Sequence, residues 1–366
     1  MLTQIYKNEQ FSKIDELLKE AAQKKASDLH LTVGIQPAFR INGKLVFSEH
    51  NRLLPNDTRE MFESITNDNQ KAHFLEYGEV DFSYSLSGYG RFRVNAFRQR
   101  GTIAIVLRLV ADRIPTLEDL GHPDILKTLA LKPRGLVLVT GPTGSGKSTT
   151  LAAMINLINQ TQYSHIITME DPVEYLHRHN KSIVNQREVN TDSLSFGNAL
   201  RAALREDPDV ILVGEMRDAE TVSTAITAAE TGHLVFATLH TCDAAQTVDR
   251  IIDTFPPYQQ QQVKVQLSMT LQGIIAQQLL PRKDGDGRIA ALEIMIATPA
   301  IRNLIREGKT HHIISSIQTG AKLGMQTMDM ALKNLVQQNL IKMEDALACA
   351  NDPDTLLRNS PVNRLV

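Results

Sequence analysis

Eight consecutive residues, Gly141 to Ser148, have the types and spacing of a phosphate-binding loop. They fit the pattern G-x-x-x-x-G-K-[ST], whose glycines let the backbone turn its N–H groups toward a phosphate. An apolar run precedes the loop and apolar residues at helical spacing follow it, which predicts a strand, a loop and a helix in that order. Lys147 is then expected to reach the β- and γ-phosphates, and the Ser148 hydroxyl to bind Mg²⁺. A glycine-rich turn without a ligand is the weaker interpretation, so the sequence predicts a nucleoside triphosphate site.

Carboxylates follow two other apolar runs. One run leads to Glu215, and a carboxylate at such a strand end can hold Mg²⁺ or polarise an attacking water. An earlier run leads to Glu170, Asp171 and Glu174, where a water attacking the γ-phosphate would find an acceptor. Asp171 and Glu215 are further candidates for Mg²⁺, and a solvated acidic turn is the alternative for the earlier group. The sequence does not rank Glu170 against Glu174.

Two histidines flank the apolar run from residue 234 to 239. His233 precedes the predicted strand and His240 follows it, at the end where ligands gather in parallel sheets. Both are candidate catalytic residues. A structural hydrogen-bonding role is the alternative for each.

An arginine pair is predicted on one face of a β-hairpin near the start of the chain. Residues 91–97 and 102–109 alternate in polarity, so Arg93 and Arg108 should both face away from the core. The two positions are symmetric about the turn near residues 100–101, which places them side by side. Like charges directly opposite are destabilising unless an anion joins them. The pattern favours arginines that face a phosphate, with a solvated basic sheet face as the alternative.

Composition excludes several classes of protein. The 366 residues carry a net charge of −2 and no Trp, so neither a global basic field nor a base-stacking platform is expected. The 2 cysteines are far apart, which leaves no disulfide framework and no four-cysteine zinc site. No apolar run is long enough to span a membrane, and the charged N-terminus does not resemble a signal peptide. A cytoplasmic protein without membrane insertion or nucleic-acid binding is expected.

The chain is predicted to contain two domains. Residues 1–112 mix helices with antiparallel strands, as in an α+β domain, and residues 113–121 form the expected linker. Residues 122–366 alternate apolar strands with helices, which predicts a mostly parallel sheet in an α/β domain. A helical stretch is expected around residues 56–76, and a mainly helical region after Pro281.

These motifs resemble those of the secretion ATPases of type IV pili and type II secretion. The resemblance rests on the loop, EDPVE (170–174), TGHLVFATLHT (231–241) and RFRVN (91–95), and it extends to VNQREV (184–189) and GEMRD (214–218). It implies an N-terminal PAS-like domain, a C-terminal RecA-like ATPase domain with a helical C-terminal part, and a homohexamer that uses ATP and Mg²⁺. It also implies that the arginine pair acts as arginine fingers, and it extends the nucleotide loop by one residue. The implied loop is Gly141, Pro142, Thr143, Gly144, Ser145, Gly146, Lys147, Ser148 and Thr149.

Within that family the chain resembles the ATPases that retract pili. It has neither the longer N-terminal region nor the four-cysteine element common in extension and secretion ATPases, and it carries a motif typical of retraction ATPases: Ala300, Ile301, Arg302, Asn303, Leu304, Ile305, Arg306 and Glu307. On a helix the apolar members would pack inward and leave Arg302 and Arg306 as an exposed i,i+4 pair. A salt-bridged surface helix is the alternative. The implied partner is an inner-membrane pilus platform protein, with the ATPase peripheral at that membrane.

Other functions remain open at this point. An accessory retraction paralogue or a type II secretion ATPase would carry similar motifs. A RecA-like nucleic-acid translocase would show a basic stripe and salt-sensitive DNA binding. A nucleotide sensor without turnover is disfavoured by the acidic residues.

Overall fold

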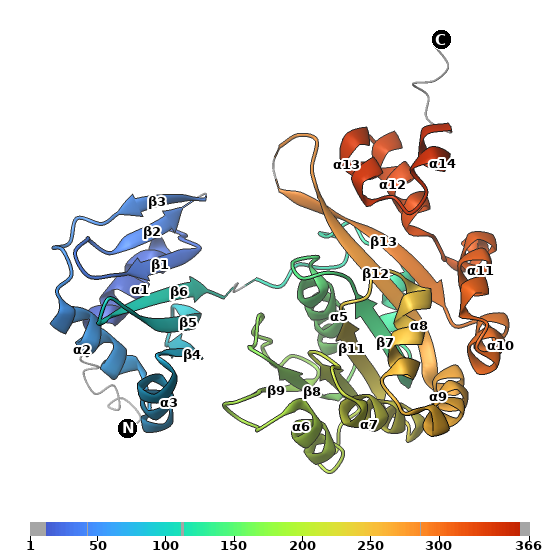
Figure 1. Ribbon diagram of the computed structural model, residues 1–366, viewed down its shortest axis with the longest axis horizontal. Helices are drawn as coiled ribbons and strands as arrows, with labels where there is room; N and C mark the ends of the chain where they lie inside the picture. The colour runs from blue at the N-terminus through green and yellow to red at the C-terminus, as the bar shows by residue number, and fades with distance from the viewer. Residues whose placement is uncertain (1–11, 42, 111–112, 286, 359–366) are drawn as a thin grey trace, which may run out of the picture. The chain divides into compact units, whose positions relative to one another are not determined.

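The computed structural model describes residues 12–41, 43–110, 113–285 and 287–358. The chain forms two compact units, residues 1–112 and 113–366 (Figure 1). Each unit combines helices with one sheet, so the predicted mixed α/β class is confirmed. Phe11 and Asn42, which the sequence places in the first helical stripe and in a hairpin turn, lie outside the described residues.

The first unit is built on a six-stranded antiparallel sheet with the strand order β3-β2-β1-β6-β5-β4. Its strands are β1 (Asp28–Leu31), β2 (Ala38–Ile41), β3 (Lys44–Phe47), β4 (Glu79–Leu86), β5 (Gly90–Gln99) and β6 (Thr102–Leu109). Its helices are α1 (Lys13–Gln23), α2 (Pro55–Ile65) and α3 (Asp68–Tyr77). The helical stretch predicted around residues 56–76 is found as the two helices α2 and α3. They separate where the Asn67 side chain accepts a hydrogen bond from the Gln70 N–H and caps α3.

Alternation along the strands places the core of this unit on one face of the sheet. Phe92, Val94 and Ala96 on β5 are buried with Ile105 and Leu107 on β6. Apolar residues of α1 and α2 pack against them. The intervening residues, including both predicted arginines, are on the opposite face.

The second unit contains a seven-stranded sheet with the order β13-β12-β7-β11-β10-β8-β9. The strands are β7 (Gly135–Thr140), β8 (His165–Glu170), β9 (Ile183–Glu188), β10 (Val210–Val213), β11 (Leu234–Leu239), β12 (Leu271–Pro281) and β13 (Arg288–Ile296). All neighbours pair in parallel except β12 and β13, which are antiparallel. The predicted mostly parallel sheet is confirmed.

Helices connect these strands and continue beyond them. They are α4 (Ile125–Ala130), α5 (Lys147–Thr161), α6 (Phe196–Ala203), α7 (Ala219–Glu230), α8 (Ala244–Asp253), α9 (Pro257–Thr270), α10 (Pro299–Glu307), α11 (Ile313–Thr319), α12 (Met328–Gln337), α13 (Met343–Cys349) and α14 (Pro353–Arg358). Two 3₁₀ helices, η1 (Thr310–His312) and η2 (Ala321–Leu323), flank α11. None of the helices in the described ranges is long and apolar enough to cross a bilayer.

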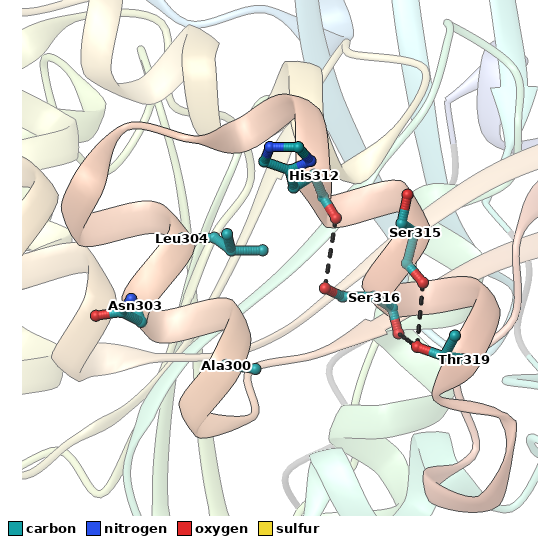
Figure 2. Close-up of a pocket in the computed structure, with 7 residues that line it drawn as sticks. All are labelled: Ala300, Asn303, Leu304, His312, Ser315, Ser316 and Thr319. Carbon is teal, nitrogen blue, oxygen red and sulfur yellow. Dashed lines mark hydrogen bonds between the residues drawn. The ribbon is translucent and has the colours of Figure 1, made fainter.

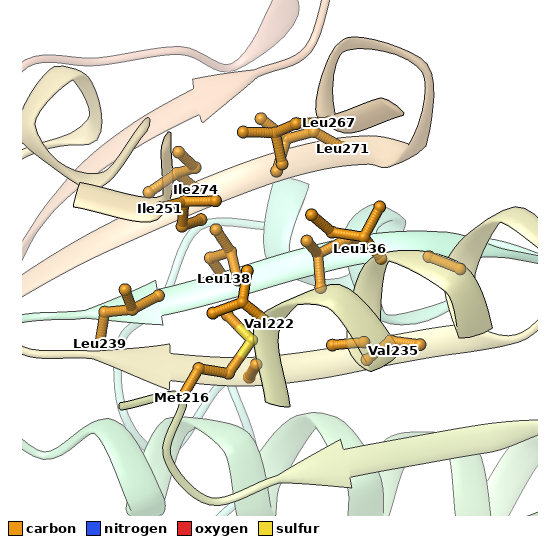
Figure 3. Close-up of a cluster of buried hydrophobic side chains, with 14 of the residues drawn as sticks. Leu136, Leu138, Met216, Val222, Val235, Leu239, Ile251, Leu267, Leu271 and Ile274 are labelled. Carbon is orange, nitrogen blue, oxygen red and sulfur yellow. The ribbon is translucent and has the colours of Figure 1, made fainter. Parts of the chain in front are cut away.

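The central strand β7 has apolar residues on both faces, because helices cover both sides of the sheet. Leu136 and Leu138 belong to a cluster with residues of α7, α8 and α9, shown in Figure 3. Val137 and Val139 point the other way, into a cluster with α4 and α5. Burial on both faces fixes β7, and the phosphate-binding loop that follows it, in the middle of the unit.

The expectation of a mainly helical chain after Pro281 was wrong at its start. β12 and β13 form a long antiparallel hairpin that extends the sheet next to β7, and helices take over only from Pro299. Residues 113–121 pack onto this second unit, since Leu117 is buried against Leu126 and Leu129 of α4.

Candidate functional site

The loop from Gly141 to Gly146 joins β7 to α5, as the motif predicts. Gly141, Gly144 and Gly146 have φ angles of +139°, +79° and +88°, in the region that favours glycine. At Gly141 a Cβ atom would lie 2.2 Å from the Gln277 carbonyl oxygen, so no other residue fits there. The loop is therefore specified by conformation and by close packing against β12.

The loop has the features of a phosphate site. α5 begins at Lys147, and the preceding Gly146 provides no side-chain cap, so the first N–H groups of the helix are left for an anion at its positive end. The buried hydroxyl oxygens of Thr140 and Ser145 have no hydrogen-bond partner among the described residues. Lys147 Nζ donates to the Gly141 and Pro142 carbonyl oxygens at 2.7 and 3.1 Å. These residues fit the triphosphate of a nucleotide.

Burial lowers the pKa of Lys147, while the nearby Glu215 and Glu174 carboxylates act in the opposite direction. A desolvated ammonium gains most from an approaching phosphate, since little water is left to be displaced. The lysine is thus already placed inside the loop for its predicted role.

A buried polar chain supports the loop from behind. The Gln277 side chain on β12 donates from Nε2 to the Ser145 carbonyl oxygen at 2.6 Å and accepts from Thr150 Oγ1 at 2.8 Å. Thr150 in turn contacts His122 Nε2 at 3.0 Å. Because the Thr150 proton is directed at Gln277, His122 must donate, which fixes its tautomer. Burial lowers the pKa of His122 to about 4, so it is neutral.

Sequence reasoning missed Gln277 and His122. The available signal for Gln277 is a glutamine among the apolar residues that form β12, and Gln272 and Gln278 share that signal. No local signal marks His122, whose partner Thr150 lies on a different element.

The carboxyl ends of β11, β10 and β8 bring further predicted residues to the edge where β7 meets the loop. Glu215 follows β10, and its carboxylate lies 3.0 Å from His240 Nε2 and 2.7 Å from Arg217 Nη2. The Arg217 hydrogen bond, with His240, holds the pKa of Glu215 below its ordinary value. The structure thus unites Glu215 with His240 and keeps that carboxylate ionised.

Glu170 and Glu174 have opposite environments. Glu170, the last residue of β8, accepts from Thr168 Oγ1 at 2.7 Å and from Gln186 Nε2 at 3.1 Å, and burial raises its pKa. Glu174 is exposed and close enough to Lys147 to influence its pKa. Asp171 is exposed and acts electrostatically on Arg217.

The remaining loop residues and the metal candidates are near these carboxylates. Thr149 Oγ1 contacts the Tyr175 hydroxyl at 2.9 Å, which links the start of α5 to the segment that carries Glu174. Ser148 is half-buried in the first turn of α5. In the described part of the chain no group of three or more His, Cys, Asp or Glu residues is arranged to hold a metal ion.

His233 is not brought to this edge. It precedes β11 at the opposite end of the sheet, where its Nδ1 lies 2.9 Å from the Ala228 carbonyl oxygen of α7. Within one subunit this arrangement matches the structural alternative, a histidine that closes the end of a helix.

In the first unit, Arg93 and Arg108 are direct cross-strand partners, so the predicted pairing is confirmed. The sequence interpretation missed Asp28, which pairs with Arg108 across β1 and β6 and accepts from its Nε at 2.8 Å. Burial disfavours the charge on Asp28, but hydrogen bonds from Arg108 and Ser27 outweigh it and hold its pKa below the ordinary value. A carboxylate of the sheet itself therefore offsets part of the arginine repulsion.

Residues 300–307 form α10 within Pro299–Glu307. Ile301 and Ile305 are buried and Leu304 packs against the same core, as expected. The expected exposed arginine pair is wrong for Arg302, whose Nη1 donates to the Ser268 and Met269 carbonyl oxygens at 2.7 Å each. Arg302 thus caps the end of α9, and Arg306 is the exposed member.

The outer side of α10 borders a shallow hollow between α10 and α11. Figure 2 shows its lining, in which α10 provides Ala300, Asn303 and Leu304, and the facing residues are His312, Ser315, Ser316 and Thr319. Asn303 and Glu307 are joined on the exposed surface by a hydrogen bond of 2.9 Å.

Comparisons with known proteins find relatives along most of the chain. The model of the type II/IV secretion system protein family matches residues 7–286. The type IV pilus retraction ATPase PilT of Pseudomonas aeruginosa is 52% identical over 341 residues, which cover 93% of this chain and 99% of that protein. A twitching motility protein of Neisseria gonorrhoeae is 52% identical over 320 residues, covering 87% of this chain and 86% of that protein.

A solved structure is similar throughout as well. The crystal structure of the pilus retraction motor PilT with bound ADP aligns with a TM-score of 0.88 and 53% identity, covering 95% of this chain and 100% of that one. Because the family model matches more than half of the sequence and these relatives align over most of it, the chain belongs to the type II/IV secretion system protein family.

Proposed function

We propose that this protein is an ATPase motor that retracts type IV pili. The observation that carries the proposal is the carboxyl edge of the second sheet. There a phosphate-binding loop, Glu215 with His240, and an exposed Glu174 meet in a chain similar over its length to a pilus retraction ATPase. ATP is the substrate, and the protein works in the cytoplasm, peripheral to the inner membrane.

The roles in hydrolysis follow from the environments of the side chains. The loop N–H groups and Lys147 hold the β- and γ-phosphates, and Ser148 would hold Mg²⁺ together with the nucleotide, near Glu215 and Asp171. Mg²⁺ supplies neutralisation of phosphate charge when bound. Glu174 orients and deprotonates the attacking water, because its carboxylate is exposed beside the lysine. Glu170 is a structural partner, since burial and hydrogen bonds occupy it.

The protein acts as a homohexamer in this proposal. Arg93 and Arg108 from one subunit stabilise charge on the phosphoryl group bound by a neighbour, and the exposed Arg93 face supports this role. The resulting motion passes to an inner-membrane platform protein through α10, whose Arg306 and polar outer side are exposed.

Lys147→Ala tests both the ATPase activity and the role in pilus retraction. Purified protein should lose MgATP turnover, and cells with only the variant should keep surface pili but lose retraction and twitching. Turnover near that of the unaltered protein would contradict the nucleotide assignment. Loss of the pili themselves would point to an assembly motor, and salt-sensitive DNA binding would point to a translocase.

Glu174→Gln and Glu170→Gln separate the two carboxylates. The first should lower kcat by about 10²-fold or more with little change in ADP affinity, as expected for loss of general-base catalysis. Glu170→Gln should mainly change the free energy of unfolding of the second unit, with a smaller effect on kcat. The reverse ranking would make Glu170 the base.

A further inference from the structure

The segment between β8 and β9 carries Glu174, and its backbone is attached on both sides of that residue. On the N-terminal side, the Val173 N–H donates to Glu188 Oε2 at 3.1 Å. The Glu174 N–H itself donates to the Glu170 carboxylate. These bonds fix the approach to Glu174 from the end of β8.

On the C-terminal side, one side chain makes most of the attachments. Gln186 Nε2 donates to the Tyr175 carbonyl oxygen at 2.8 Å, and Gln186 Oε1 accepts from the His177 N–H at 2.8 Å. The same Nε2 also donates to Glu170 Oε1 at 3.1 Å. The Gln186 amide therefore uses both its donors and its acceptor to connect the segment to β8 and β9, and its orientation is determined by these partners.

Parallel pairing explains how one strand reaches both sides. Gln186 pairs with Thr168 and Glu188 with Glu170 in the register of β9 on β8. Residues two apart on a strand point to the same side, so Gln186 and Glu188 face the crossing segment together. Both residues belong to the motif VNQREV, to which the hydrolysis scheme assigns no role.

The Glu174 carboxylate differs from its surroundings. It is exposed, and no hydrogen bond joins it to any residue within the described ranges. A fixed backbone with an unoccupied side chain is the arrangement expected of a group held ready for a reacting water, since misplacement by about 1 Å can cost about 10²-fold in rate.

We propose that Gln186 is a positioning residue for Glu174: its amide holds the 173–177 backbone so that the Glu174 carboxylate faces the γ-phosphate and the attacking water. Glu188 assists from the other side. This inference rests on the proposed function, in which Glu174 is the base.

Gln186→Met tests it in the full-length, assembled protein, because methionine keeps the length of the side chain and removes its hydrogen bonds. We expect kcat for MgATP to fall about 10²-fold while KM changes by less than about two-fold, the pattern of an interaction needed in the transition state. Asn185→Met is the matched control. Asn185 lies on the other side of the same strand, where its amide contacts His165 at 2.8 Å.

A double-mutant cycle shows whether the effect acts through Glu174. In the Glu174→Gln background, Gln186→Met should cause no further loss of kcat, because the group that it positions is already disabled. A purely structural role would instead give additive losses and overturn the inference. The inference would also be overturned if kcat of Gln186→Met were no lower than that of Asn185→Met, or if KM of Gln186→Met rose without a fall in kcat.

A pH profile gives an independent readout. Gln186→Glu presents a carboxylate to the Tyr175 carbonyl and to Glu170, and only its protonated form regains a donor. Its kcat, relative to the unaltered protein, should therefore rise as pH falls, whereas that of Gln186→Met should not. A profile parallel to that of the unaltered protein would contradict the inference. If Gln186→Met does not fold, Gln186→Asn, which is one methylene too short to make the same bonds, takes its place.

The same variants distinguish the positioning role of Gln186 from the assignment of Glu174 as the base. Loss of turnover in Glu174→Gln with normal turnover in the Gln186 variants would reject the positioning role alone. Normal turnover in Glu174→Gln would reject the assignment of the base itself.

Discussion

The side-chain amide of Gln277 donates a 2.6 Å hydrogen bond to the main-chain carbonyl of Ser145, a residue 132 positions earlier in the chain. This bond ties the long strand β12 to the tip of the phosphate-binding loop. Because Gln277 also accepts from Thr150, the loop and the first turns of α5 are held by one side chain.

Gln277→Leu should weaken nucleotide binding. Each lost hydrogen bond contributes about 1 kcal/mol, so ADP affinity should fall about tenfold, which corresponds to about 1.4 kcal/mol. Calorimetric titration with ADP measures the change. Gln278→Leu is the control, since its side chain points to the other face of β12, and equal losses in both variants would contradict a specific role for Gln277.

Glu215→Gln should slow hydrolysis far more than it weakens binding. Arg217 and His240 keep the pKa of Glu215 low, so its charge is present throughout the neutral range. Removing that charge should cost kcat about 10²-fold or more, while the shape of the site is preserved. Steady-state turnover and ADP titration are compared with those of Glu230→Gln, an exposed carboxylate on α7. A loss of affinity as large as the loss of turnover would make Glu215 a binding group.

Arg93→Ala and Arg108→Ala should each lower turnover, by up to the ~10³–10⁵-fold seen for arginine fingers. Mixing either variant with Lys147→Ala subunits should restore part of the activity, because an intact loop would then meet an intact arginine from a neighbour. Turnover is measured across mixing ratios. If turnover of the mixtures is no higher than the summed turnover of the two variants measured alone, the arginines do not act between subunits.

The two arginines of α10 should behave differently. Arg302→Ala should lower the free energy of unfolding by about 1–3 kcal/mol, because two carbonyl oxygens at the end of α9 lose a charged donor. Arg306→Ala should leave stability within about 0.5 kcal/mol and keep ATP turnover, yet abolish twitching. Thermal unfolding, turnover and motility are measured for both. Normal twitching in cells with Arg306→Ala would show that Arg306, on the exposed side of α10, is not needed for force transfer.

Acid should destabilise the second unit partly through His122. Burial lowers its pKa from 6.5 to about 4 in the folded chain, so the unfolded chain binds more protons between these values. The contribution of His122 to the free energy of unfolding is complete above pH 6.5. It is lost as pH falls toward 4, by about 3 kcal/mol in all. His122→Gln, which keeps a donor for Thr150, should flatten this decline. Calorimetric unfolding across pH is compared with His311→Gln, an exposed histidine, whose decline should match that of the unaltered protein.

Features set by short stretches of sequence could be predicted. The phosphate-binding loop depends on glycines at fixed spacing, and the pairing of Arg93 with Arg108 follows from alternation about one turn. The parallel sheet follows from apolar runs separated by helices. In each case the residues that decide the outcome are close in sequence.

Features set by packing could not be predicted. β12 begins directly after α9, and its mixture of apolar residues and glutamines has no clear period. Arg302 looks like a surface residue in its own helix, and only the placement of α9 beside α10 brings carbonyl oxygens to it. Asp28 likewise reaches Arg108 through pairing between strands 80 residues apart.

β12 has a mechanical consequence. Arg302 donates to the Met269 carbonyl oxygen, at the end of α9 just before the strand begins. Within the strand, Gln277 binds the phosphate-binding loop at Ser145. Near the end of the strand, Leu280 packs among residues of α12 and α13. A β-strand is already almost fully extended, at about 3.3 Å per residue, so the roughly 20 Å between Leu271 and Gln277 can lengthen little beyond the irregularity between Leu271 and Gly273. Tension applied where α9 ends would therefore reach the phosphate-binding loop through a segment that stretches little.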